Sequence, residues 1–178
     1  RLGRLLLIPL VLGLSACAVT GGSAPSVTVV ANHPNVVSFW NDIANKTVLA
    51  ASKVNTTPEE QRPTFFFDLA SVHVAIYDAV VAIEGRYKPF AVKPKSPATG
   101  ASVDAAVSAA AYGVLKALFP NRGASYQAAY EQRVAAVPDG QAKTLGLALG
   151  SEVAEEVVRL RANDGRSVAL APYVSGTA

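Results

Sequence analysis

Apolar residues recur at steps of three and four along most of the chain after residue 34, the spacing that places them on one face of an α-helix. No stretch alternates apolar and polar residues as a half-buried strand would, so the two Asp-Gly pairs are expected at helix ends rather than in hairpins. We expect an all-α fold, a bundle of about five helices with short antiparallel turns and one long crossover. The expected helices cover residues 35–53, 57–84, 103–118, 125–137 and 140–163.

Residues that favour helix ends flank these stretches. Thr57 begins a Thr-Pro-Glu-Glu sequence typical of a capping box, and Ser102 is placed to cap the third helix. Asp139 is expected to start the fifth helix, while Gly85 and Gly165 are expected to end the second and fifth.

Length and composition favour one packed domain. The chain has 178 residues, of which 51% are hydrophobic, so disorder is a poor interpretation for most of it. Without Arg1 and Arg4, which lie in an expected signal peptide, 14 basic residues face 13 acidic ones, a balance that predicts no nucleic-acid partner. A single cysteine and two histidines make an internal disulfide impossible and predict no metal site.

The N-terminal residues have the organisation of a secretion signal. Residues 1–16 combine arginines, a short apolar run and small residues, and the run is far below the ~20 residues that span a bilayer, which disfavours a permanent transmembrane anchor. The sequence Leu14-Ser15-Ala16-Cys17 resembles a bacterial lipobox, so Cys17 is the expected lipidation site and membrane anchor. Ala18 in place of aspartate favours the outer membrane, facing the periplasm. Residues 17–34 are expected to form a flexible tether.

His73 is the most tempting catalytic candidate, because it is the only histidine inside an expected helix and Tyr77 lies one turn on. Asp68 and Asp78 stand five residues to either side, about 140° around the helix in each direction, so neither converges with His73. We expect a buried histidine satisfied by Tyr77, backbone or water, and structural polar contacts for both aspartates.

The remaining candidates also favour structural roles. Trp40 and the Phe65-Phe66-Phe67 run are expected in the core rather than in a pocket. A solvated loop is expected to contain Lys88, Lys93 and Lys95. Surface ion pairs are expected among Glu152, Glu155, Glu156 and Arg159.

Five sequence motifs, taken in their order along the chain, resemble those of a known protein family. They are Val37-x-x-Trp40-Asn41-Asp42, Ala70-x-x-His73-x-Ala75-x-Tyr77-Asp78-Ala79-Val80-x-Ala82-Ile83, Tyr87-x-Pro89-Phe90, Ala109-Ala110-Ala111-Tyr112-x-Val114-Leu115-x-x-Leu118-Phe119-Pro120, and Val137-Pro138-Asp139-Gly140-x-Ala142-Lys143. Over residues 36–170 the chain resembles the N-terminal helical region of bacterial vanadium-dependent haloperoxidase-like proteins, members of the type 2 phosphatidic acid phosphatase superfamily.

The resemblance implies that the chemistry lies outside this chain. In that family a Lys, two Arg, a Ser-Gly-His and a second His further along the chain bind vanadate or phosphate. This sequence contains no Ser-Gly-His, and Arg62-Pro63 follows Lys53 by nine positions where the family has seven. No catalytic, cofactor-binding or metal residue is therefore assigned here. Residues 35–170 are expected to be the helical region and residues 171–178 the start of a missing C-terminal part.

These observations lead to three hypotheses. The leading one is the scaffold of a lipid-anchored haloperoxidase-like enzyme that oxidises halide with peroxide on vanadate bound outside this chain. This scaffold would be inactive alone and would pack against the missing catalytic half. The first alternative is a phosphomonoesterase of the same superfamily, and the second is a non-catalytic helical envelope lipoprotein that binds a partner. Enzyme activity and homo-oligomer formation are left open.

Overall fold

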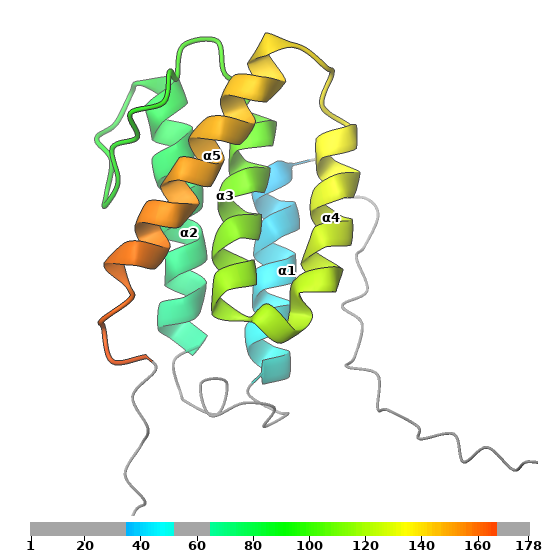
Figure 1. The fold of residues 1–178 in the computed structure, drawn as a ribbon, viewed down its shortest axis with the longest axis vertical. Coiled ribbons are helices and arrows are strands. Elements are labelled where there is room, and N and C mark those ends of the chain that lie inside the picture. The colour runs from blue at the N-terminus through cyan, green and yellow to red at the C-terminus, as the bar shows by residue number, and fades with distance from the viewer. Residues whose placement is uncertain (1–34, 52–64, 167–178) are drawn as a thin grey trace, which may run out of the picture.

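A computed structural model describes residues 35–51 and 65–166. This part of the chain is all-α, as expected, and contains no strand. Its elements are α1 (Val36–Ala51), α2 (Phe65–Glu84), α3 (Val103–Leu118), the short 3-10 helix η1 (Pro120–Arg122), α4 (Gly123–Ala135) and α5 (Gln141–Leu160) (Figure 1).

Helix α3 lies at the centre of the bundle and contacts α1, α2, α4 and α5. Successive helices run in opposite directions, and α5 crosses α2 and α3 on the side away from α1 (Figure 1). The connection from Gly85 to Ser102 joins antiparallel neighbours at one end of the bundle. The prediction of one long crossover is therefore wrong for this connection. It is long, but it folds along the outside of the bundle and does not cross to the other end.

Two predicted helix ends are confirmed. The Ser102 hydroxyl accepts a hydrogen bond from the backbone N–H of Ala105, which caps α3. Gly85 follows the last residue of α2 with φ +69°, and its N–H donates to Val81 O at 2.9 Å. Glycine suits that position because other residues rarely adopt a positive φ.

Four predicted boundaries differ, and one of them is the end of α4, which lies at Ala135 rather than Val137. Helix α4 begins at Gly123 rather than Ser125, because η1 leads directly into it. Helix α5 ends at Leu160 rather than Asn163, and Gly140, not Asp139, is its N-cap. The Asp139 carboxylate instead accepts a hydrogen bond from Lys143 Nζ at 2.8 Å. The expected signal peptide, tether, capping box and residues 167–178 lie outside the described residues.

The core confirms the prediction for Trp40, which is fully buried and lies edge-on to Phe39. Tyr126 of α4 is equally buried, and its hydroxyl donates to Thr47 Oγ1 of α1 at 3.1 Å. The core prediction is wrong for Phe66 and Phe67, which are 70% and 64% exposed. Consecutive helical residues point about 100° apart, so three in a row cannot all face one core.

Glycines set the distance between α3 and α5. A β-carbon at Gly146 would lie 2.4 Å from Ser102 O, and one at Gly113 would lie 2.6 Å from the Ala154 β-carbon. Both distances are shorter than atoms tolerate, so the two helix backbones meet only because these positions lack side chains. The close approach of α3 and α5 therefore depends on these glycines.

Within the described ranges, Phe66–Glu84 is long and apolar enough to cross a membrane, and α3 with the bent segment Pro120–Ala135 passes the same test as a pair. Helix α2 contacts α1, α3 and α5, and 44% of its apolar stretch is buried in the bundle. A core helix of a soluble protein has the same length and composition, so this is weak evidence for a span.

Candidate functional site

His73 is tied to the neighbouring helix α1. Its Nε2 lies 3.0 Å from Asn41 Oδ1, which also accepts from Asn45 Nδ2 at 3.0 Å. An amide oxygen only accepts, so His73 Nε2 carries the proton and donates. Burial lowers the pKa of the imidazole below 6.5, which favours the neutral form. The imidazole has a hydrogen-bond partner, as expected, but it is half-buried rather than buried. Its partner is Asn41 rather than Tyr77, backbone or water, and the Tyr77 hydroxyl donates to Lys88 O at 3.2 Å.

Asp78 anchors the connection between α2 and α3. Its fully buried carboxylate accepts hydrogen bonds from three consecutive backbone N–H groups, those of Phe90 at 2.5 Å, Ala91 at 2.9 Å and Val92 at 2.7 Å. These bonds confirm the predicted structural contact and occupy both carboxylate oxygens.

Asp68 has a structural contact of a different kind. It pairs with Arg166 through Nε at 2.8 Å and Nη2 at 3.2 Å, and both side chains are almost completely buried. Arg166 Nη2 also donates to Leu118 O at 3.0 Å. The pair therefore fastens the chain beyond α5 to the start of α2 and the end of α3.

The three acidic residues of α5 differ in role. The ion-pair prediction for Glu155 is wrong, because its carboxylate has no ion-pair partner among the described residues. Glu156 pairs with Arg159 at 2.6 Å, as its spacing predicted. Glu152 instead accepts hydrogen bonds from the backbone N–H groups of Lys95 at 2.7 Å and Ser96 at 2.8 Å, which lower its carboxyl pKa. The ion-pair prediction for Glu152 is wrong because its partner lies in the connection, far away in sequence. The predicted solvated lysines, Lys88, Lys93 and Lys95, are exposed.

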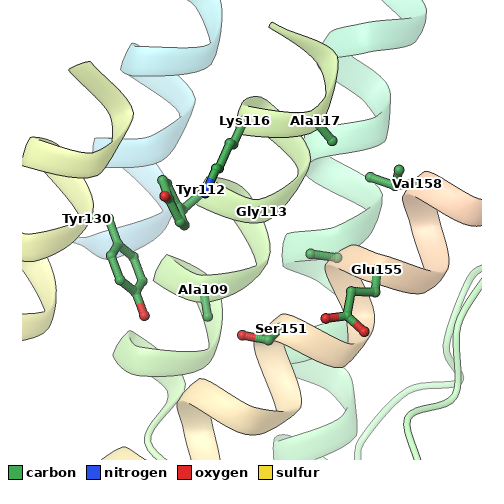
Figure 2. Close-up of a pocket in the computed structure, with 10 residues that line it drawn as sticks. Ala109, Tyr112, Gly113, Lys116, Ala117, Tyr130, Ser151, Glu155 and Val158 are labelled. Atoms are coloured by element: carbon green, nitrogen blue, oxygen red, sulfur yellow. The ribbon is translucent and has the colours of Figure 1, made fainter. Parts of the chain in front are cut away.

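An open pocket of about 290 Å³ lies between α3, α4 and α5, and we call it the α3–α4–α5 pocket (Figure 2). Its apolar floor contains Ala109, Gly113 and Ala154. These small residues leave space over α3 and α5, and α4 packs on α3 with few contacts to α5. Its polar rim consists of Tyr112, Lys116, Tyr130, Ser151 and Glu155.

Two tyrosines form one wall of this pocket. The rings of Tyr112 and Tyr130 stack with centroids 4.6 Å apart and an interplanar angle of 20°. The Tyr112 hydroxyl donates to Gln127, and Lys116 Nζ lies 5.5 Å from the Tyr112 ring centroid. Burial raises the pKa of the Tyr130 phenol, with a smaller contribution from Tyr112, so this hydroxyl stays protonated near neutral pH.

A second concavity of about 250 Å³, which we call the α2–α5 groove, is almost wholly apolar. Val74 and Val157 line it, and the exposed side chains of Phe90 and Leu160 stand at its rim, 77% and 53% accessible. Arg161 also lines the groove, and it donates to Phe67 O at 3.0 Å. Such clustering of exposed apolar side chains is typical of an interaction surface.

Sequence reasoning placed none of the polar rim residues in a shared site. The signal available was Ala109, Gly113 and Ala117 at steps of four, which marks a face of α3 without bulk. The partners across this face come from α4 and α5, and their positions depend on tertiary packing.

Across residues 35–51 and 65–166, no group of three His, Cys, Asp or Glu side chains is placed to hold a metal ion. No protein-family model, no curated protein and no solved structure matches the chain.

Proposed function

We propose that the bundle is the scaffold of a lipid-anchored enzyme of the haloperoxidase and phosphatidic acid phosphatase superfamily. In this proposal it supports a catalytic helical half that holds vanadate or phosphate. The single observation that supports it best is the α2–α5 groove, where Phe90 and Leu160 expose apolar surface beside Val74 and Val157. An apolar surface of this kind favours a protein partner.

The roles of the ionisable residues are consistent with a supporting part. Asp78 and Glu152 hold the connection between α2 and α3, and Asp68 holds Arg166. His73 is bonded to Asn41 and is kept neutral by burial. These groups stabilise the bundle, so the chemistry in this proposal belongs to residues outside it.

The test is to sequence the gene past codon 178 and express its full product. The product is assayed for vanadate-dependent bromination of a phenol and, in parallel, for hydrolysis of a phosphomonoester. Bromination is the expected result. Hydrolysis without bromination would support the phosphomonoesterase alternative. If the product shows neither activity, the enzyme proposal is overturned, and the remaining hypothesis is an envelope lipoprotein whose groove binds a partner.

Attachment is tested separately. Replacing Cys17 by serine removes the thiol to which lipid is attached, so labelled lipid should no longer be incorporated and the protein should leave the membrane fraction. A Cys17→Ser protein that still carries label and sediments with membranes would contradict the lipobox interpretation.

A further inference from the structure

The α3–α4–α5 pocket has polar groups that the protein itself leaves unused. Among the described residues, the side chains of Ser151 and Glu155 and the Tyr130 hydroxyl make no hydrogen bond or ion pair. The Lys116 ammonium also has no hydrogen bond or ion pair and lies 5.5 Å from the Tyr112 ring centroid. Four such groups around one hollow can each bind a ligand without first breaking an existing bond.

Opposite charges lie on different helices of the pocket. Lys116 comes from α3 and Glu155 from α5, and they do not pair with each other. In Figure 2, Ser151, Glu155 and the Tyr130 hydroxyl lie along one edge of the pocket, while Lys116 lies toward the other. One edge therefore suits a hydrogen-bond donor with positive charge, and the other suits an anion.

The surface between these two edges is apolar and smooth. Ala109, Gly113 and Ala154 present methyl groups and a bare backbone, which suit methylene groups rather than a polar chain. A volume of about 290 Å³ lies just below the range of roughly 300–1,000 Å³ for ligand sites. A ligand of a few heavy atoms fits this space.

We propose that the α3–α4–α5 pocket binds a small zwitterion in which an ammonium group and a carboxylate are separated by a short methylene chain. The ammonium is held by Glu155 with Ser151 and Tyr130, the carboxylate by Lys116, and the methylenes lie on Ala109 and its neighbours. None of the residues lining this pocket lines the α2–α5 groove, so the inference does not depend on the proposed function.

The test titrates the full chain with 4-aminobutyrate and 6-aminohexanoate, with butylamine and butyrate as probes that carry one charge each. Chemical shifts of the pocket residues report the site, and the dissociation constant of the better zwitterion is expected at about 1 mM or below. Each single-charge probe is expected to bind about tenfold more weakly, because it leaves one rim charge without a partner. Equal binding of a zwitterion and a single-charge probe would overturn the proposal, as would no shifts with either zwitterion.

Neighbouring residues supply matched variants. Glu155→Gln and Lys116→Gln should each weaken binding of the zwitterion about tenfold. Glu156→Gln, one position along but paired with Arg159 outside the pocket, and Lys93→Gln in the exposed connection should leave it within about twofold. If neither Glu155→Gln nor Lys116→Gln weakens binding, the assignment of the charged groups is overturned.

A third variant tests the location without touching charge. Ala117 is exposed at the pocket rim, so Ala117→Trp should fill the hollow with little effect on folding. Binding of every probe should then be lost while the unfolding midpoint stays unchanged. Unchanged affinity in this variant would place any bound zwitterion elsewhere and contradict the proposal.

Discussion

Gly150 of α5 lies directly against the backbone of Ala106 in α3: a β-carbon at Gly150 would be 2.1 Å from the Ala106 carbonyl oxygen. This contact joins the two most extensively packed helices of the bundle. The space is filled by backbone atoms, which cannot rotate away as a flexible side chain can.

Gly150→Ala is therefore expected to destabilise the protein. Alanine favours a helix over glycine by about 1 kcal/mol, but the added methyl group forces α5 away from α3. We expect a net loss of about 2–3 kcal/mol in the free energy of unfolding, measured by urea denaturation.

Gly123→Ala is the matched control. Gly123 begins α4 with φ −52°, and a β-carbon there meets nothing within 4 Å. The substitution should stabilise the protein by about 0.5–1 kcal/mol. Changes of the same sign in both variants would contradict the close approach of α3 and α5.

Asp78→Ala should release the connection between α2 and α3. Three backbone N–H groups, at residues 90–92, lose a buried anionic acceptor, and we expect a loss of about 2–4 kcal/mol in the free energy of unfolding. Hydrogen exchange at Ala91 and Val92 should accelerate more than exchange within α3. Asp139→Ala removes an exposed carboxylate and should leave the free energy of unfolding almost unchanged. Unaltered exchange in the connection would show that Asp78 does not hold it.

Protonation of His73 should make stability depend on pH. Burial lowers its pKa in the folded protein below 6.5, so the unfolded chain binds the proton more readily. Neutral His73 therefore contributes its full stabilisation above pH 6.5, the ordinary pKa of the imidazole in the unfolded chain. This stabilisation is lost as the pH falls toward the lowered pKa of His73 in the folded protein. Between about pH 7 and pH 5, His73→Gln should lose less stability than the unsubstituted protein, because glutamine can still donate to Asn41 without titrating. Identical pH profiles in urea denaturation would contradict this assignment.

The α2–α5 groove should bind an apolar fluorescent dye. Replacing Phe90 and Leu160 together by serine removes the exposed rim, so dye fluorescence should fall by about half or more while the free energy of unfolding changes by less than about 1 kcal/mol. Leu49→Ser, which changes a side chain of α1 that is also exposed, serves as control. An equal decrease in both proteins would remove the groove as the dye site and weaken its role as an interaction surface.

Local sequence patterns were sufficient for the helices and several of their ends. The three- and four-residue spacing predicted five helices, and Ser102 and Gly85 act at the ends where they were expected. These features depend on a few neighbouring residues, because helix periodicity and capping are local interactions. Where local signals competed, at Asp139 and Ser125, the predicted boundaries were displaced by one or two residues.

The contacts between distant residues were decided by tertiary structure. Sequence spacing excluded a dyad of His73 with Asp68 or Asp78, but it could not supply Asn41, Arg166 or residues 90–92 as their partners. The same holds for the rim of the α3–α4–α5 pocket, whose side chains come from three helices. Helix-forming preference acts over one or two turns, whereas the direction in which helices pack depends on where side chains are missing, as at Gly150 against Ala106.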